Sequence, residues 1–291
     1  MIRSIFVAAI FCLVCSVGSV AHAYETKSDD YFQLRWEASE AQADKLFFLV
    51  QQYQIVPRVS AFVDQNLHLD QTVEVVVHQG GEPIFDRLSQ RVYLPVSVFY
   101  ELYASVQNRY PEQLQTAERL FAASAERLVW QQLVKLLVSQ FALRMEGEEA
   151  FVLDSFATLS LLNLYDNPYV MDAAEEFLLV EDADLVFSER YPSEEELDKA
   201  RYQRMACLIL GRDYQPYLDV LDNLSWDNAR IENCQKRYQQ ELARWLQALE
   251  GRLKEGSRMP YWLPADYVPE ADEVEPELED VSPAGLNNLG S

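Results

Sequence analysis

Histidine and cysteine are the residues best suited to bind a metal ion, and both are scarce in this sequence. Of three histidines and four cysteines in 291 residues, only His68, His78, Cys207 and Cys234 follow residue 23. Structural zinc sites take Cys and His ligands at short, regular spacings. The two histidines are ten residues apart and far from Cys207, which fits no such spacing. We therefore predict that these four residues form no zinc site.

The first 23 residues have the layout of a secretory signal peptide. Arg3 precedes an apolar stretch from Ile5 to Val17, and Ala21-His22-Ala23 is a small-x-small cleavage pattern. This apolar stretch is shorter than a membrane-spanning helix. We predict that residues 1–23 are removed, that the mature chain has no membrane span, and that the protein is periplasmic or secreted. Because oxidising compartments favour disulfides, we also predict a Cys207–Cys234 bridge.

The overall charge argues against a protein that binds nucleic acid. With 24 Lys and Arg against 47 Asp and Glu, the formal net charge is −23. Nucleic-acid binding needs clustered basic residues, so we predict no nucleic-acid partner.

A hydrophobic share of 49% is enough for a sizeable core. We predict one domain over residues 24–263 and a disordered, acidic, Pro-rich tail over 264–291, which would aid solubility or contact basic partners.

Hydrophobic periodicity predicts a small sheet followed by helices. Residues 31–67 are predicted as two helical segments, and the β-branched run 72–78 is predicted as a strand, with short strands at 83–85 and 91–94. Long helices are predicted from 112 to 143 and from 149 to 165, and further helices at 194–210 and 234–253. The predicted fold class is α+β, with a small N-terminal β-sheet and a predominantly helical body.

A polar stripe runs along the longest predicted helix. Gln131, Lys135 and Ser139 recur every four residues on a helix that is otherwise apolar, and Gln132 lies beside them. Polar groups on a buried helix must face water, a cleft or a partner. This stripe is therefore a candidate site.

Three segments of the chain carry spaced motif residues. They are Gly147, Glu149 and Asp154, then Arg201, Tyr202, Cys207, Leu208 and Gly211, then Cys234, Tyr238 and Trp245. With the long helix before them, these segments resemble a bacterial family of exported metallopeptidases catalogued as a domain of unknown function. In that family an H-E-x-x-H zinc helix is followed by G-x-E-E-D-x-x-D, by Q-R-[FY]-x4-C-L-x-x-G and by C-x-x-[EY]-Y-x6-W. The resemblance covers about residues 70–255. It implies a zincin-like peptidase scaffold.

The resemblance also implies that the zinc site is lost. In H-E-x-x-H sites the two His bind zinc, the Glu is the general base, and a Glu on the following helix completes the ligands. The segment Gln131-Gln132-Leu133-Val134-Lys135 takes these places here, and Ala150 falls at the third-ligand position. The amide of Gln132 cannot abstract a proton, and Lys135 brings a positive charge to a cation site. The resemblance thus implies no catalytic residue and no zinc cofactor.

These observations lead to one preferred hypothesis of function. The protein would be a pseudoenzyme that binds a peptide, protein or cell-envelope partner at the remnant site, which we define as Gln131, Gln132, Lys135, Glu149 and Asp154. An Asp154–Lys135 ion pair would take the place of the metal.

Two alternatives remain open. One is an active hydrolase whose metal is held elsewhere, by His68, His78 and nearby carboxylates. The other is a helical scaffold unrelated to peptidases. Close contact between the helices that carry residues 131 and 150 would separate the preferred hypothesis from this last one.

Overall fold

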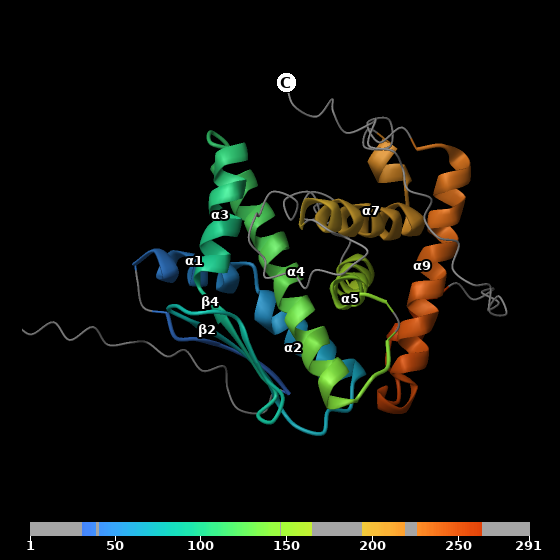
Figure 1. The fold of residues 1–291 in the computed structure, drawn as a ribbon, viewed down its shortest axis with the longest axis horizontal. Helices are drawn as coiled ribbons and strands as arrows, with labels where there is room; N and C mark the ends of the chain where they lie inside the picture. The colour runs from blue at the N-terminus through green and yellow to red at the C-terminus, as the bar shows by residue number, and fades with distance from the viewer. Residues whose placement is uncertain (1–30, 39–40, 146, 165–193, 219–225, 264–291) are drawn as a thin grey trace, which may run out of the picture.

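The computed structural model describes residues 31–38, 41–145, 147–164, 194–218 and 226–263 (Figure 1). The predicted signal peptide and acidic tail lie outside the described residues. In chain order the elements are β1 Phe32–Trp36, α1 Ala41–Gln52, α2 Ile55–Asn66, β2 Val73–His78, β3 Ile84–Asp86, β4 Arg91–Pro95, α3 Ser97–Arg109, α4 Leu114–Gln140, α5 Glu149–Leu164, α7 Glu194–Arg212 and α9 Asn228–Ala248, with short 3-10 helices at Gln215–Tyr217, Glu250–Arg252 and Met259–Trp262.

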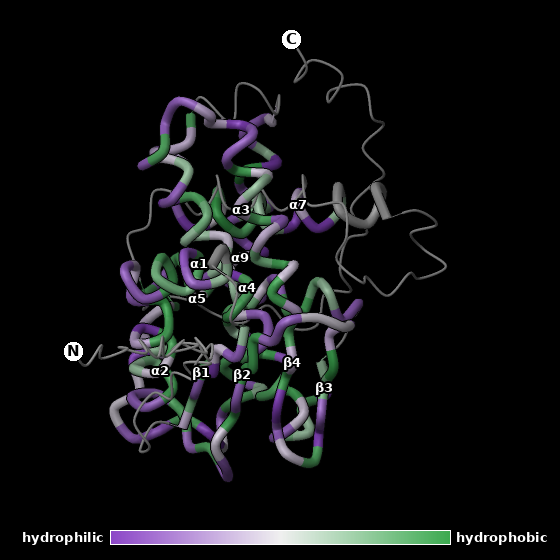
Figure 2. The backbone as a smooth tube through the Cα atoms, turned by 90° about the vertical axis from the view of Figure 1, so that its left-hand side faces the viewer, coloured by the Kyte–Doolittle hydropathy of each residue, from purple (hydrophilic) through white to green (hydrophobic). Residues whose placement is uncertain are grey.

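The strands form one mixed sheet in the order β1-β2-β4-β3, which Figure 2 shows side by side. β1, β2 and β4 are parallel, and β3 pairs antiparallel with β4. Leu34, Val75 and Val92 lie in one register row, and all three are buried on the face that packs against the helices. The predicted strands at 72–78, 83–85 and 91–94 are confirmed, as is the α+β fold class.

The first strand corrects the prediction of a helix from residue 31. Phe32, Leu34 and Trp36 are buried, whereas Gln33 and Arg35 between them are partly exposed. This alternation has a period of two, which is the period of a strand with one face in the core. The helical prediction is correct only for α1 and α2 further along.

Helix α4 is the centre of the body. It packs against α5, α3, β2 and β4, while α7 joins α5 to α9. Figure 1 shows α5 nearly end-on between α4 and α9. Trp130 on α4, Phe156 on α5 and Trp245 on α9 are fully buried, with the rings of Phe156 and Trp245 4.6 Å apart.

Helix α9 begins six residues earlier than predicted, at Asn228. The cause is a local cap, because the Asp227 carboxylate accepts a hydrogen bond from the Arg230 N–H at 2.8 Å. Across the described residues, no helix combines the length and the apolar content that crossing a bilayer requires.

Candidate functional site

The remnant site lies where α4 crosses α5. Gln131 Nε2 donates a hydrogen bond to Asp154 Oδ1, and one turn further along α4 the Lys135 ammonium lies 3.5 Å from Glu149 Oε1. The two helices therefore contact each other through Gln131 and Lys135, the two positions of α4 at which the resemblance places metal ligands.

Gly147 sets the entry into α5. Its φ is +105°, a backbone conformation that residues other than glycine rarely adopt. The chain can therefore turn sharply after α4 and start α5 at Glu149. This turn brings Glu149 opposite Lys135 and places Asp154, one and a half turns later, opposite Gln131.

Asp154 is buried and lies at the centre of a charged network. The residue is 2% exposed, and its carboxylate binds two guanidinium groups besides the Gln131 amide. Arg201 on α7 binds with Nε 2.6 Å from Oδ2 and Nη2 3.1 Å from Oδ1, and Arg127 Nη1 on α4 is 3.3 Å from Oδ1. We call Arg127, Gln131, Asp154 and Arg201 the Asp154 network. It joins α4, α5 and α7.

The expected Asp154–Lys135 ion pair is wrong. Lys135 pairs with Glu149 and lies 5.7 Å from the centre of the Phe85 ring on β3. The reason is helical phase: Lys135 is one turn beyond Gln131, so it reaches the start of α5 rather than its second turn. Arginines occupy the places around Asp154 that the prediction gave to this lysine.

The remaining positions of the remnant site are less engaged. Gln132 is half-buried beside Gln131, and Ala150 is half-buried at the start of α5. Glu149 is exposed. The accessible part of the remnant site is therefore Lys135, Glu149 and the edge of Gln132, because Gln131 and Asp154 are buried.

A zinc ion does not fit the side chains present here. Of the four replaced positions, Gln131 uses its amide N–H on Asp154, Ala150 has no donor atom, and the ammonium of Lys135 repels a cation. The carboxylate of Asp154 already accepts bonds from three side chains. Within the described ranges, no three His, Cys, Asp or Glu side chains group in a way that could hold a metal ion.

The two histidines lie in different surroundings. His68 precedes β2, and its backbone N–H donates to the Arg252 carbonyl, whereas His78 ends β2 with its ring against Tyr93. Among the described residues, neither histidine belongs to a group of three His, Cys, Asp or Glu side chains that could hold a metal ion.

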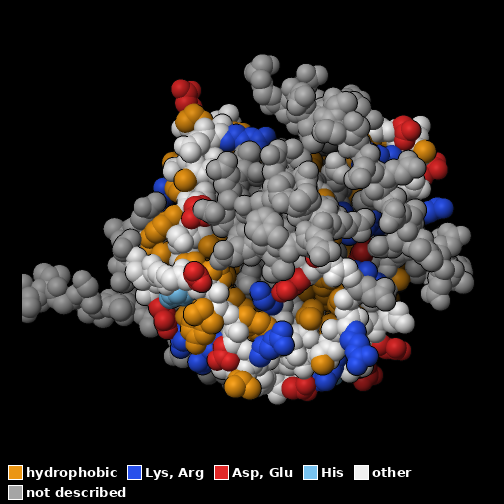
Figure 3. Space-filling view, viewed as in Figure 1, with side chains coloured by type: hydrophobic (Ala, Val, Ile, Leu, Met, Phe, Trp, Pro, Cys, Tyr) orange, Lys and Arg blue, Asp and Glu red, His pale blue; other side chains and the backbone are white. Residues whose placement is uncertain are grey.

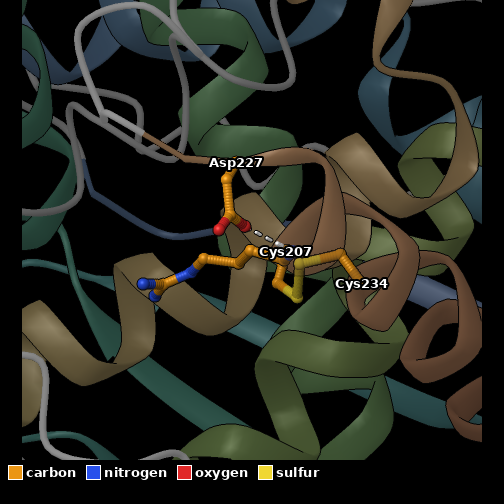
Figure 4. The surroundings of a disulfide bond; sticks show 4 residues. Cys207, Asp227 and Cys234 are labelled. Carbon is orange, nitrogen blue, oxygen red and sulfur yellow. Dashed lines mark hydrogen bonds between the residues drawn. A yellow bond between two sulfur atoms is a disulfide. The ribbon is translucent and has the colours of Figure 1, made fainter.

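The predicted Cys207–Cys234 disulfide is confirmed. It joins α7 to α9 across a sequence separation of 27 residues, next to the Asp227 cap (Figure 4). Gly211 follows Cys207 by one turn and faces the same partner, because a Cβ placed on it would lie 2.2 Å from the Cys234 carbonyl oxygen. The third and fourth resemblance segments thus meet at one helix contact.

A polar hollow that the sequence did not indicate lies on the outer face of the sheet. It is lined by Gln33, Arg35, Thr72, Glu74, Ser89 and Arg91. Arg91 Nε is 2.5 Å from Glu74, and Arg35 Nε is 2.9 Å from Glu37 and 3.5 Å from Glu74. The lining thus holds two arginines and one glutamate, and each arginine is already paired with a carboxylate, of Glu74 or of the neighbouring Glu37.

Glu126 is a buried carboxylate on α4, one helical turn before Trp130. Its side chain is 1% exposed and is paired with Arg58 on α2. Burial raises the pKa of Glu126 above its ordinary value of 4.5, and the hydrogen bond and charge of Arg58 offset only part of that shift. The Arg58–Glu126 pair thus connects α2 to α4 across 68 residues of sequence. Helical periodicity alone does not reveal such a contact.

The raised pKa of Glu126 predicts a measurable pH dependence of stability. The folded chain binds this proton more tightly than the unfolded chain does, so the contribution is complete below pH 4.5 and is lost as pH rises through the raised pKa. Glu126→Gln removes the titration. In urea unfolding between pH 4.5 and 8, we expect the free energy of unfolding of the native chain to fall with rising pH relative to that of this variant. If the free energies of unfolding of the native chain and of Glu126→Gln changed in parallel with pH, the prediction would be wrong. The control is Glu112→Gln, which removes a carboxylate at an exposed position.

Comparison with protein families places residues 36–249 in the family DUF4344, described as "Putative metallopeptidase". No curated protein and no solved structure matches the chain significantly. The matched range covers most of the chain and includes the whole Asp154 network, the remnant site and the disulfide.

Proposed function

Since the chain belongs to this "Putative metallopeptidase" family, we propose that it is an exported and catalytically inactive member that acts by binding a partner. The partner would be a peptide, a protein or a component of the cell envelope. The periplasm or the exterior would be its place of action, in keeping with the signal-peptide pattern of residues 1–23 and with the disulfide.

One observation supports the loss of catalysis most directly. The positions that would carry ligands and base face each other across α4 and α5, yet they hold Gln131, Gln132, Lys135 and Ala150. Lys135 is paired with Glu149 at 3.5 Å, so a side-chain cation lies at the place where a metal cation would be expected. With Gln132 at the position of the general base and no ligand set for a metal ion, the arrangement lacks the two groups that activate water in a zinc peptidase.

The accessible part of the remnant site suits a polypeptide partner. Lys135 offers an ammonium group, Glu149 a carboxylate, and Phe85 of β3 an aromatic ring near the ammonium. In the view of Figure 3, Lys and Arg are interspersed with Asp and Glu over the lower part of the described surface. A surface of mixed charge favours a partner that carries both charges over a uniformly charged polymer.

Zinc stoichiometry tests the inactive assignment. The mature chain from Tyr24, with its disulfide intact, is equilibrated with zinc, desalted and measured by elemental analysis. We expect far less than one zinc per chain and no peptidase activity on unstructured polypeptides. One bound zinc per chain would overturn the assignment, and His68→Ala and His78→Ala would then locate the metal.

The same preparation tests binding. A library of immobilised peptides is screened with the native chain and with Lys135→Glu, which reverses one charge of the accessible pair. We expect selected peptides to bind the variant at least about tenfold more weakly, because a like-charge contact replaces an ion pair. Lys236→Glu, at an exposed position on α9, is the matched control. Equal loss in both variants would point to net charge rather than to the remnant site.

A further inference from the structure

Gln131 differs from the other replaced positions because it keeps a partner inside the protein. Its amide N–H donates to Asp154, one of the residues that match the family pattern. Lys135 and Ala150 make no bond to that carboxylate. The contact is buried, since Gln131 is 5% exposed and Asp154 2%.

This contact has the form of the outer hydrogen bond of a metal ligand. A histidine that binds a metal through one ring nitrogen almost always donates the N–H of the other nitrogen to a carboxylate or carbonyl. A glutamine amide can replace that donor, because it too places an N–H at the end of a flexible stem. It does not supply the second, metal-facing nitrogen.

We infer that Gln131 has kept the outer hydrogen bond of a ligand position and lost the metal bond, and that the Asp154 network now joins α4, α5 and α7 directly. The inference rests on the proposed absence of a metal. In a zinc site, ligands from two helices are held together through the ion. In this chain the bonds from Arg127, Gln131 and Arg201 converge on one carboxylate instead.

Burial explains why such a network would be kept after the metal is lost. An ionised carboxylate in the interior needs opposite charge and hydrogen-bond donors. Arg201 supplies a two-point contact from α7, and Arg127 and Gln131 come from the same face of α4, one turn apart. Removing any donor would leave part of the charge of Asp154 uncompensated, so each helix is tied to the other two.

Substitutions at Gln131 separate this role from ordinary packing. Gln131→His keeps an N–H for Asp154, whereas Gln131→Leu fills similar space without a donor. We expect the melting temperature to fall by about 4–8 °C in Gln131→Leu and by less than about 2 °C in Gln131→His. Gln132→Leu, at the half-buried neighbouring position outside the network, is the control and should change little.

A zinc titration of melting temperature completes the test. The variant Gln131→His/Gln132→Glu/Lys135→His/Ala150→Glu restores every ligand position, and we expect zinc to raise its melting temperature by several degrees, about 5 °C at a large excess over the dissociation constant. We expect zinc to shift the native chain by less than about 1 °C.

The outcomes distinguish the two proposals. A zinc-dependent shift in the native chain would overturn the proposed function and this inference together. Without such a shift, equal melting temperatures for Gln131→Leu and Gln131→His would overturn the inference alone. Failure of Gln131→His to fold would also overturn it, because that variant keeps the donor. A four-residue variant that folds but ignores zinc would show that position 131 is not a former ligand position.

Discussion

Replacing Cys207 and Cys234 together by alanine is expected to lower the free energy of unfolding by about 3–4 kcal/mol. The bridge closes a loop of 27 residues between α7 and α9, and its loss frees the unfolded chain to sample more conformations. Both cysteines are buried, so the alanines also leave space in the contact between these helices. Urea unfolding of the native and double-variant chains measures the difference.

A reducing agent is the control for the disulfide. It should destabilise the native chain by a similar amount and leave the double variant unchanged, because only the native chain has a bond to reduce. A double variant within about 1 kcal/mol of the native chain would contradict the expectation. It would mean that α7 and α9 are held together mainly by their side-chain contacts.

The residues that match the family pattern act mainly in the scaffold. Asp154 and Arg201 join α5 to α7, Cys207 and Cys234 join α7 to α9, and the Trp245 indole on α9 donates to Ser155 on α5 at 3.0 Å.

Much of the fold could be predicted because its elements have strong local patterns. The run from Val73 to Val77 is β-branched, and the long apolar pattern of α4 has the helical period, so both were found from the sequence. The strand Phe32–Trp36 was not predicted. Its alternation of buried and partly exposed residues is only five residues long, and the longer helical pattern that follows was extended back over it. Its pairing with β2 is a long-range contact that local propensity cannot show.

The candidate site was predicted in outline but not in its bonds. Gln131 and Lys135 lie on one stripe of α4, and that stripe indicates a shared face without indicating which turn of α5 each residue meets. Arg127 was not singled out, although it precedes Gln131 by one turn and so lies on the same face. The sequence does contain a signal for Arg127, because a charged residue within an apolar helical run needs a partner when it is buried. The same signal applies to Glu126.

Gly211→Ala is expected to destabilise the protein by about 3 kcal/mol, the upper end of the range for overpacking a well-filled contact. A Cβ at this position would lie 2.2 Å from the Cys234 carbonyl oxygen and 2.6 Å from its carbonyl carbon. Both are backbone atoms of α9, and the adjacent disulfide holds that helix close, so neither side can move away cheaply. Alanine gains about 1 kcal/mol of helix propensity over glycine, which is too little to offset the clash.

Gly251→Ala is the matched control for this substitution, because nothing lies within 4 Å of a Cβ built there. Thermal and urea unfolding should show Gly251→Ala close to the native chain and Gly211→Ala well below it. Combining Gly211→Ala with the double cysteine variant should reduce the cost of the alanine, since α9 can then shift away from α7. Equal stability of the two glycine variants would show that the contact between α7 and α9 is looser than described. The disulfide would then be spanning a gap between these helices rather than fastening a close contact.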